Sequence, residues 1–269
     1  MTVLIGWIGV DSHSPCSAYL LSDSRFSWGT NRDTYNYGRK LFALKNSPDI
    51  LGYCGDAFFS SQVLSQIVSL DENNLLFQKN VSSLIRSRTI LDQINKQFDS
   101  YPAHARNKSV IYHISRDCDA TFRVYKYSCD AKSNFWIASD IEYDSSHSNL
   151  ILRAGTGAEE FVALYSKYER GDISGTSRNV YQCFCDALKH TQIPSCGGAP
   201  QLVGLYRGEK FNGLSFGIIY NGKRYFLGSP LEECSSDNVT RWYNENFEIC
   251  DGATMNRLPN AMRQPNPNL

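Results

Sequence analysis

The sequence predicts an α+β protein folded as a four-layer αββα sandwich, with two antiparallel sheets between two pairs of helices. The first observation is the order of segments: strand-like stretches end near residue 56, resume from 109 to 154, and return from 201 to 227. The second is that two helix-like segments separate each strand-rich region from the next. A helix pair on each outer face would bury both sheets, and 269 residues suffice for that core.

Strands are predicted where short apolar or alternating runs are bounded by turn residues. A polar turn at 11–15 joins the first two strands, and Asn221 with Gly222 predicts a tight hairpin near the end. Residues 26–38 are rich in Asn, Gly and Tyr without clear periodicity, so we expect a loop there. The predicted strands span residues 2–10, 17–23, 40–45, 50–54, 109–114, 121–127, 135–139, 150–154, 201–206, 214–220 and 223–227.

Four helices are predicted from the spacing of apolar residues. In the first, Phe59, Val63 and Ile67 recur every fourth residue, which is typical of one buried helix face. Proline or glycine follows the ends of the later helices, where a helix normally stops. The predicted helices span residues 57–70, 81–98, 155–168 and 178–191.

These elements contain no internal repeat, so residues 1–251 are predicted to form a single domain. From residue 252 onward the chain is rich in asparagine and proline. A segment of this composition does not usually form a packed core by itself. Residues 252–269 are therefore predicted to be a flexible tail or an arm bound at an interface.

Composition excludes several classes of function. The 27 basic residues balance 27 acidic ones, which argues against nucleic-acid or membrane-surface binding. The longest apolar run, residues 3–10, is too short to span a bilayer and lacks the features of a secretory signal. Nine cysteines without a CxxC pair indicate reduced thiols, and the five histidines follow no metal-ligand spacing. We therefore expect a cytoplasmic protein without metal or cofactor.

The start of the chain contains a candidate nucleophile. Thr2 directly follows the initiator methionine, so removal of Met1 would give one residue both a hydroxyl and a free α-amine. The hydroxyl could attack a carbonyl while the amine accepts its proton. An unperturbed α-amine has a pKa of ~7.7–8.0, which suits that role near neutral pH.

Short motifs follow Thr2 in a recognisable order. Asp-Ser-Arg at 23–25 ends the second predicted strand, Arg-Lys-Leu-Phe at 39–42 opens the third, and Gly-Tyr-Cys-Gly at 52–55 ends the fourth. Further along are Gly-Thr-Gly at 155–157 and Cys-Gly-Gly at 196–198. In these motifs and in element order over residues 2–228, the chain resembles proteasome β-subunits and the related bacterial peptidases, which are N-terminal-nucleophile (Ntn) hydrolases.

The resemblance implies a role for each matching residue. Thr2 would be the nucleophile, and Lys40 a fixed positive charge that lowers its effective pKa. Asp23 would pair with Lys40 and hold it. The Gly55 backbone amide would stabilise the oxyanion, and Arg25 would brace the adjoining loop through carbonyl or carboxylate contacts.

Two further positions would surround the amine of Thr2. Thr156 matches a family serine, and Cys196 stands where the family has another serine. Ile193 replaces an aspartate that the family uses near this amine, so amine activation must differ here. Ser195 or Asp186 are the residues that could compensate.

Other interpretations remain open at this stage. Thr156 could simply cap a helix, with Glu159 completing a capping box. The whole chain could be a catalytically silent scaffold or regulatory subunit of proteasome-like type, or a small-molecule amidase on the same fold. The main hypothesis is a threonine hydrolase that cleaves peptides or unfolded protein through an acyl-ester on Thr2. The resemblance also implies homo-oligomeric rings and an ATP-dependent unfoldase partner.

Overall fold

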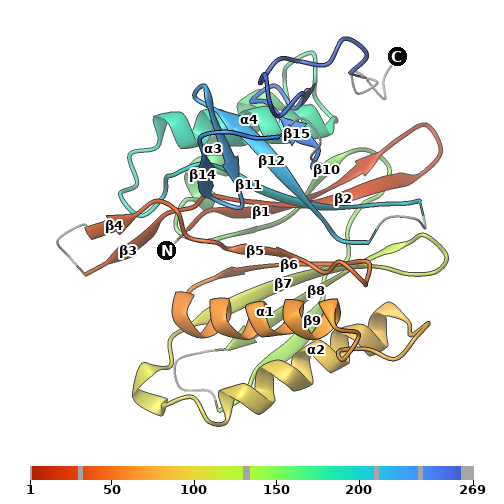
Figure 1. The fold of residues 1–269 in the computed structure, drawn as a ribbon, viewed down its shortest axis with the longest axis vertical. Coiled ribbons are helices and arrows are strands. Elements are labelled where there is room, and N and C mark those ends of the chain that lie inside the picture. The colour runs from red at the N-terminus through yellow and green to blue at the C-terminus, as the bar shows by residue number, and fades with distance from the viewer. Residues whose placement is uncertain (1, 30–32, 130–133, 209–211, 236–238, 262–269) are drawn as a thin grey trace.

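Two β-sheets lie face to face, with a pair of helices on the outer side of each (Figure 1). The computed structural model describes residues 2–29, 33–129, 134–208, 212–235 and 239–261. Its layers run helix, sheet, sheet, helix, which is compatible with the predicted αββα sandwich. The last eight residues of the predicted tail, 262–269, lie outside the described residues. Within 252–261, Arg257 forms a β-bridge with Cys250.

The larger sheet contains the first and the last strand of the described chain. Its main path is β10-β1-β2-β11-β12-β13-β14, with β15 beside β12 and β16 beside β15. All neighbours are antiparallel except β12 and β15. The strands are β1 (Leu4–Val10), β2 (Pro15–Ser22), β10 (Asn149–Ala154), β11 (Gln201–Tyr206), β12 (Leu214–Tyr220), β13 (Lys223–Phe226), β14 (Ser229–Leu231), β15 (Trp242–Tyr243) and β16 (Ile249–Cys250).

The smaller sheet is an antiparallel meander in the order β5-β6-β7-β8-β9. Sequential strands pair directly, as expected when hairpins connect them. The strands are β5 (Leu41–Ala43), β6 (Asp49–Cys54), β7 (Ser109–Arg116), β8 (Phe122–Cys129) and β9 (Ile137–Asp140).

Helices α1 and α2 begin at well-formed caps. Asp56 caps α1 (Ala57–Glu72) by accepting from the amides of Phe58 and Phe59, and Ser82 caps α2 (Ser83–Phe98). Both helices contact the smaller sheet. On the other side, α4 (Ser177–His190) packs on β1 and β10 and pairs with α3 (Ala158–Tyr168). Short polar side chains at helix starts satisfy amides that lack helical partners, which explains these boundaries.

Three apolar clusters hold the layers together, one between the sheets and one under each helix pair. The cluster between the sheets joins the larger sheet to the smaller through fully buried aliphatic residues. Because strand side chains alternate, the same strands supply the helix-facing clusters with their other faces. Representative members between the sheets are Leu4, Leu20, Ile50, Ile114 and Val203.

The prediction of a loop at 26–38 was wrong in part, because this segment contains a short hairpin. Strands β3 (Phe26–Trp28) and β4 (Asp33–Tyr35) pair antiparallel, with Phe26 opposite Tyr35. The two rings lie 6.4 Å apart, an aromatic cross-strand pair of the kind that stabilises a hairpin. Three-residue strands are too short to show the alternation that sequence analysis depends on. The C-terminal strands β14, β15 and β16 were missed for the same reason.

A buried ionic network links the smaller sheet to α2. Asp49, which has no exposed surface, accepts from His113 Nε2 at 2.7 Å and pairs with Arg86 Nε at 2.8 Å. Burial raises the pKa of the Asp49 carboxyl, but the His113 contact and the Arg86 charge outweigh it, so the net pKa is below its usual value.

This pKa shift predicts acid sensitivity. The unfolded chain binds a proton at Asp49 near pH 3.8, before the folded chain does, so stability falls as the pH drops below about 4. Urea unfolding between pH 6 and 3 should therefore show a shallower pH dependence in Asp49→Asn than in the wild type. Asp92→Asn, at an exposed position of α2, should keep the wild-type dependence. Equal slopes in the wild type and Asp49→Asn would contradict the assignment.

Candidate active site

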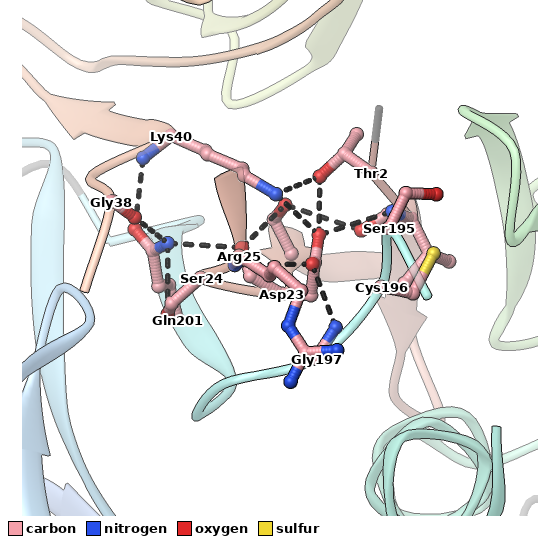
Figure 2. Close-up of polar contacts among 12 residues, drawn as sticks. Thr2, Asp23, Ser24, Arg25, Gly38, Lys40, Ser195, Cys196, Gly197 and Gln201 are labelled. Atoms are coloured by element: carbon pink, nitrogen blue, oxygen red, sulfur yellow. Dashed lines mark hydrogen bonds and ion pairs between the residues drawn. The ribbon is translucent and has the colours of Figure 1, made fainter. Parts of the chain in front are cut away.

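Strand pairing brings Thr2 and Asp23 together. Thr2 lies two residues before β1 and Asp23 directly follows β2, and the register places Leu4 opposite Ser22. The ends of this hairpin therefore lie side by side, although 20 residues separate them in sequence. Lys40 comes from the opposite sheet, one residue before β5. The candidate site thus lies where residues from the two facing sheets meet, and Figure 2 shows Lys40 and Asp23 beside Thr2.

The three side chains form a closed polar cluster. The Thr2 hydroxyl donates to Asp23 Oδ1, and Lys40 Nζ donates to the Thr2 hydroxyl. Lys40 Nζ also lies 2.7 Å from Asp23 Oδ1, so the expected ion pair is present. The exposed fractions are 2% for Thr2, 0% for Asp23 and 2% for Lys40. A charged pair shielded from water in this way acts strongly on a neighbouring hydroxyl.

Backbone amides hold the Asp23 carboxylate in one orientation. Oδ1 also accepts from the Val3 amide at 3.1 Å. Oδ2 accepts from the amides of Arg25 at 3.2 Å and Gly197 at 3.1 Å. Hydrogen bonds to a carboxylate are stronger than those between neutral groups, so this carboxylate is rigidly placed.

Gln201, at the start of β11, is a residue that the sequence analysis missed. Its Oε1 accepts from the Lys40 amide at 3.0 Å, while Nε2 donates to the carbonyls of Asp23 at 3.1 Å and Gly38 at 2.7 Å (Figure 2). One buried amide side chain therefore ties the backbone of Lys40 to that of Asp23. A glutamine opening a strand carries no motif, so only the three-dimensional contacts reveal it.

Arg25 braces the neighbouring loop, as the resemblance implied. Its Nε donates to Asn36 Oδ1 at 2.7 Å and its Nη1 to the Pro194 carbonyl at 3.1 Å. The guanidinium also lies against Gly197, where an added Cβ would come within 2.6 Å of Arg25 Cζ. The φ of +150° at Gly197 likewise disfavours any larger residue. The Gly197 amide can therefore approach Asp23 only because this position has no side chain.

Thr156 and Cys196 lie beside the Thr2 backbone. The Gly157 amide donates to the Thr2 carbonyl at 3.3 Å, and a Cβ on Gly155 would collide with that same oxygen. Thr156 Oγ1 lies 3.0 Å from Ser195 Oγ and 3.9 Å from Cys196 Sγ. Helix α3 has Gly157 at its N-cap without a side-chain bond, so Thr156 is not the capping residue.

Of the two candidates to compensate for Ile193, only Ser195 is near the site. Asp186 accepts a hydrogen bond from the Tyr168 hydroxyl, which lies on the helix pair. Ser195 is buried and contacts Thr156. Burial, together with the nearby Asp23 charge, raises the pKa of the Cys196 thiol, so this group stays neutral at ordinary pH.

Gly55 lies opposite these residues, at the end of β6. Its φ is +108°, and an added Cβ would collide with the Lys108 carbonyl. Within the described part of the chain its amide donates to no acceptor. Gly55 and Thr2 both line each of the two cavities at the site. The amide is therefore available to an oxygen bound beside the Thr2 hydroxyl.

Substituting Gly55 tests this backbone geometry. We expect Gly55→Ala to lower the free energy of unfolding by about 1–2 kcal/mol for the left-handed backbone, plus about 1–3 kcal/mol for the collision. Gly222→Ala is the matched control, because φ there is +68° but no atom lies within 4 Å of an added Cβ. Denaturant unfolding should show the larger loss at Gly55. Equal losses at both positions would mean that the backbone near Gly55 shifts and relieves the collision with the Lys108 carbonyl.

Two cavities meet at Thr2. One, of about 280 Å³, is lined by Lys40, Tyr53 and the aromatic side chains Phe26, Trp28 and Phe58. The other, of about 520 Å³, is lined by residues of β7 and β8 and by Gly155 and Thr156; among its polar members are Lys108, Tyr112, Lys126 and Ser128. A chain crossing Thr2 would therefore pass from an aromatic environment into a basic one.

The described residues contain no group of three or more His, Cys, Asp or Glu side chains that could hold a metal ion. In the same ranges, no helix is both long and apolar enough to cross a membrane. Met1, whose removal the hypothesis requires, lies outside the described residues.

The sandwich has the proteasome-like fold, in which two facing sheets are covered by helices on both sides. A solved structure of a mutant of Anbu from Hyphomicrobium sp. strain MC1, a bacterial proteasome-like protein, matches it with a TM-score of 0.54. The match covers 86% of this chain and 89% of that chain at 10% sequence identity, so it shows the fold alone. No family model matches the sequence, and comparison with curated proteins finds no match.

Proposed function

We propose that this protein is a proteasome-like threonine hydrolase that cleaves peptide or amide bonds with Thr2 as its nucleophile. The observation that supports this most directly is the contact of the Thr2 hydroxyl with both Lys40 and Asp23 at the meeting point of two cavities. A threonine with a structural role alone would not require a buried lysine aimed at its oxygen.

The proposed reaction begins after Met1 is removed. The Thr2 oxygen attacks the scissile carbonyl, and its proton passes to the α-amine, directly or through a water. The carbonyl oxygen becomes an oxyanion that accepts from the Gly55 amide. The amine then returns the proton to the leaving nitrogen as the carbon–nitrogen bond breaks. Water hydrolyses the resulting ester and restores Thr2.

Each neighbour of Thr2 has a defined part in this scheme. The positive charge of Lys40 favours the ionised hydroxyl, while Asp23 fixes the position of the ammonium group. Gln201 and the Gly197 amide are positioning groups, because they contact Lys40 and Asp23 rather than the reacting atoms. Thr156 and Ser195 supply hydroxyls on the side of the Thr2 backbone, where the family's aspartate is missing.

The proposal is tested by intact mass before and after treatment with an electrophile directed at N-terminal threonine. The expected result is loss of Met1 and a single covalent adduct, which is absent in Thr2→Ala. Retained Met1 together with no adduct would overturn the hydrolase proposal, because a blocked amine cannot accept the proton.

A second candidate is a catalytically silent scaffold or regulatory subunit. The observation that favours it is the replacement of the expected aspartate and serine by Ile193 and Cys196, the latter a buried thiol held neutral. If the protein is a scaffold, Thr2→Ala should leave its assembly and its partner binding unchanged. A small-molecule amidase would instead turn over short amides but not peptides, without forming a ring.

We further propose that the protein assembles into cytoplasmic homo-oligomeric rings, with an ATP-dependent unfoldase as a partner. Leu84 and Ile85 on α2 are 46% and 48% exposed, an apolar pair of the kind that protein contacts bury. Mass photometry should find a multiple of 30.4 kDa for the wild type and a smaller species for Leu84→Glu/Ile85→Glu. Lys96→Glu, elsewhere on α2, should not change the mass. A monomeric wild type would contradict the ring.

A further inference from the structure

The cavity of about 520 Å³ beside Thr2 has an unusual lining on strand β8. Val124, Lys126 and Ser128 alternate along this strand, so all three point toward the larger sheet. Val124 is buried in the cluster between the sheets, whereas Lys126 and Ser128 line the cavity. The face of β8 thus changes from apolar to basic as it leaves the core and approaches Thr2.

Two lysines give the cavity its charge. Lys126 is half-buried and Lys108, just before β7, is exposed, and no acidic residue is among the cavity's described lining residues. Neither ammonium forms an ion pair with a carboxylate of the described chain. A half-buried charge facing the space between two sheets is costly unless an anion or water compensates it.

The cavity also has a defined position relative to the proposed reaction. It shares Thr2 and Gly55 with the aromatic cavity, but it alone is lined by Gly155 and Thr156, which pack beside the Thr2 backbone. The amine that returns the proton belongs to that backbone. A leaving nitrogen must lie within reach of the amine, so the leaving group would occupy the basic cavity.

We infer that this cavity is a subsite for an acidic leaving group, and that Lys126 and Lys108 select substrates with a carboxylate directly after the cleaved bond. The inference rests on the proposed function and names the substrate class of the same site. The Tyr112 and Ser128 hydroxyls in the cavity lining are further polar groups that a carboxylate could meet. On the other side of the bond, the aromatic cavity would accept an apolar side chain.

The test uses three peptides that differ only in the residue after the cleaved bond, which is Glu, Gln or Lys. The wild type should cleave the Glu peptide with a kcat/KM about tenfold above that of the Gln peptide, since charge-assisted contacts reach that size. High salt should reduce the ratio. Lys126→Glu should reverse the order and favour the Lys peptide. Lys223→Glu, an exposed position on β13, makes the same charge change and should leave the order intact.

The outcomes separate the inference from the proposed function. Cleavage of all three peptides at equal rates, or preference for a carboxylate before the cleaved bond, would overturn the inference and leave the hydrolase intact. Absence of both cleavage and the Thr2 adduct would overturn the hydrolase. Binding of the same peptides to Thr2→Ala, measured by fluorescence anisotropy, then decides the subsite: tighter binding of the Glu peptide supports it, and equal binding overturns it.

Discussion

Thr2→Ala should abolish peptide cleavage, with a fall in kcat of at least about 10⁴-fold, the scale seen when a covalent nucleophile is removed. The hydroxyl of Thr2 is the group held between Lys40 and Asp23, and no other hydroxyl contacts both in the described chain. Alanine is small enough to leave removal of Met1 unaffected. The measurement is steady-state hydrolysis of a fluorogenic peptide, with circular dichroism to confirm that the variant folds.

Thr2→Ser is the matched variant for this experiment. It retains a hydroxyl and an α-amine at the same position, so a substantial part of the activity should remain. Cleavage by Thr2→Ala near the wild-type rate would rule out Thr2 as the nucleophile. Loss of activity in both variants with a normal fold would show that the methyl group of Thr2 is also needed for positioning.

Lys40→Met should lose both activity and stability. The Asp23 carboxylate has no exposed surface, and removing its only charged partner in the described chain leaves a buried charge uncompensated. Such losses cost about 3–5 kcal/mol in free energy of unfolding. Activity should fall by at least about 10²-fold, because no other cationic side chain of the described residues contacts the Thr2 hydroxyl. Urea unfolding and peptide hydrolysis measure the two effects separately.

Two controls distinguish these effects. Lys45→Met removes a lysine whose partner Glu72 lies at 2.8 Å on the surface, and such pairs are worth about 0–1 kcal/mol. Asp23→Asn combined with Lys40→Met should recover part of the stability, because the buried charge is then gone, but none of the activity. Recovery of activity in the double variant would show that the ion pair serves folding alone.

Much of the site could be predicted from the sequence because its residues lie at the ends of strands. Thr2, Asp23 and Lys40 each flank a strand with clear apolar patterning, and pairing of the first hairpin then brings two of them together. The glycine at 155 was also visible in the sequence, and its contact with the Thr2 carbonyl explains why a larger residue does not fit there.

Other features depend on contacts that leave no local pattern. Gln201 organises the site through hydrogen bonds to residues over 160 positions earlier, and nothing in its neighbourhood indicates this role. The β3–β4 hairpin is too short to show periodicity, although Phe26 and Trp28 of β3 line the cavity beside Thr2. Likewise, nothing in the sequence around Lys126 indicates that it lines the same cavity as Thr2.

Because the polar cluster is divided between two sheets, it can form only late in folding. Thr2 and Asp23 belong to the larger sheet and Lys40 to the smaller one, so each sheet alone holds an incomplete set. A newly synthesised chain would stay chemically inert until the two layers dock. The proposed nucleophile would therefore become active only after the two sheets have packed together. Activity would therefore report on the integrity of the whole sandwich.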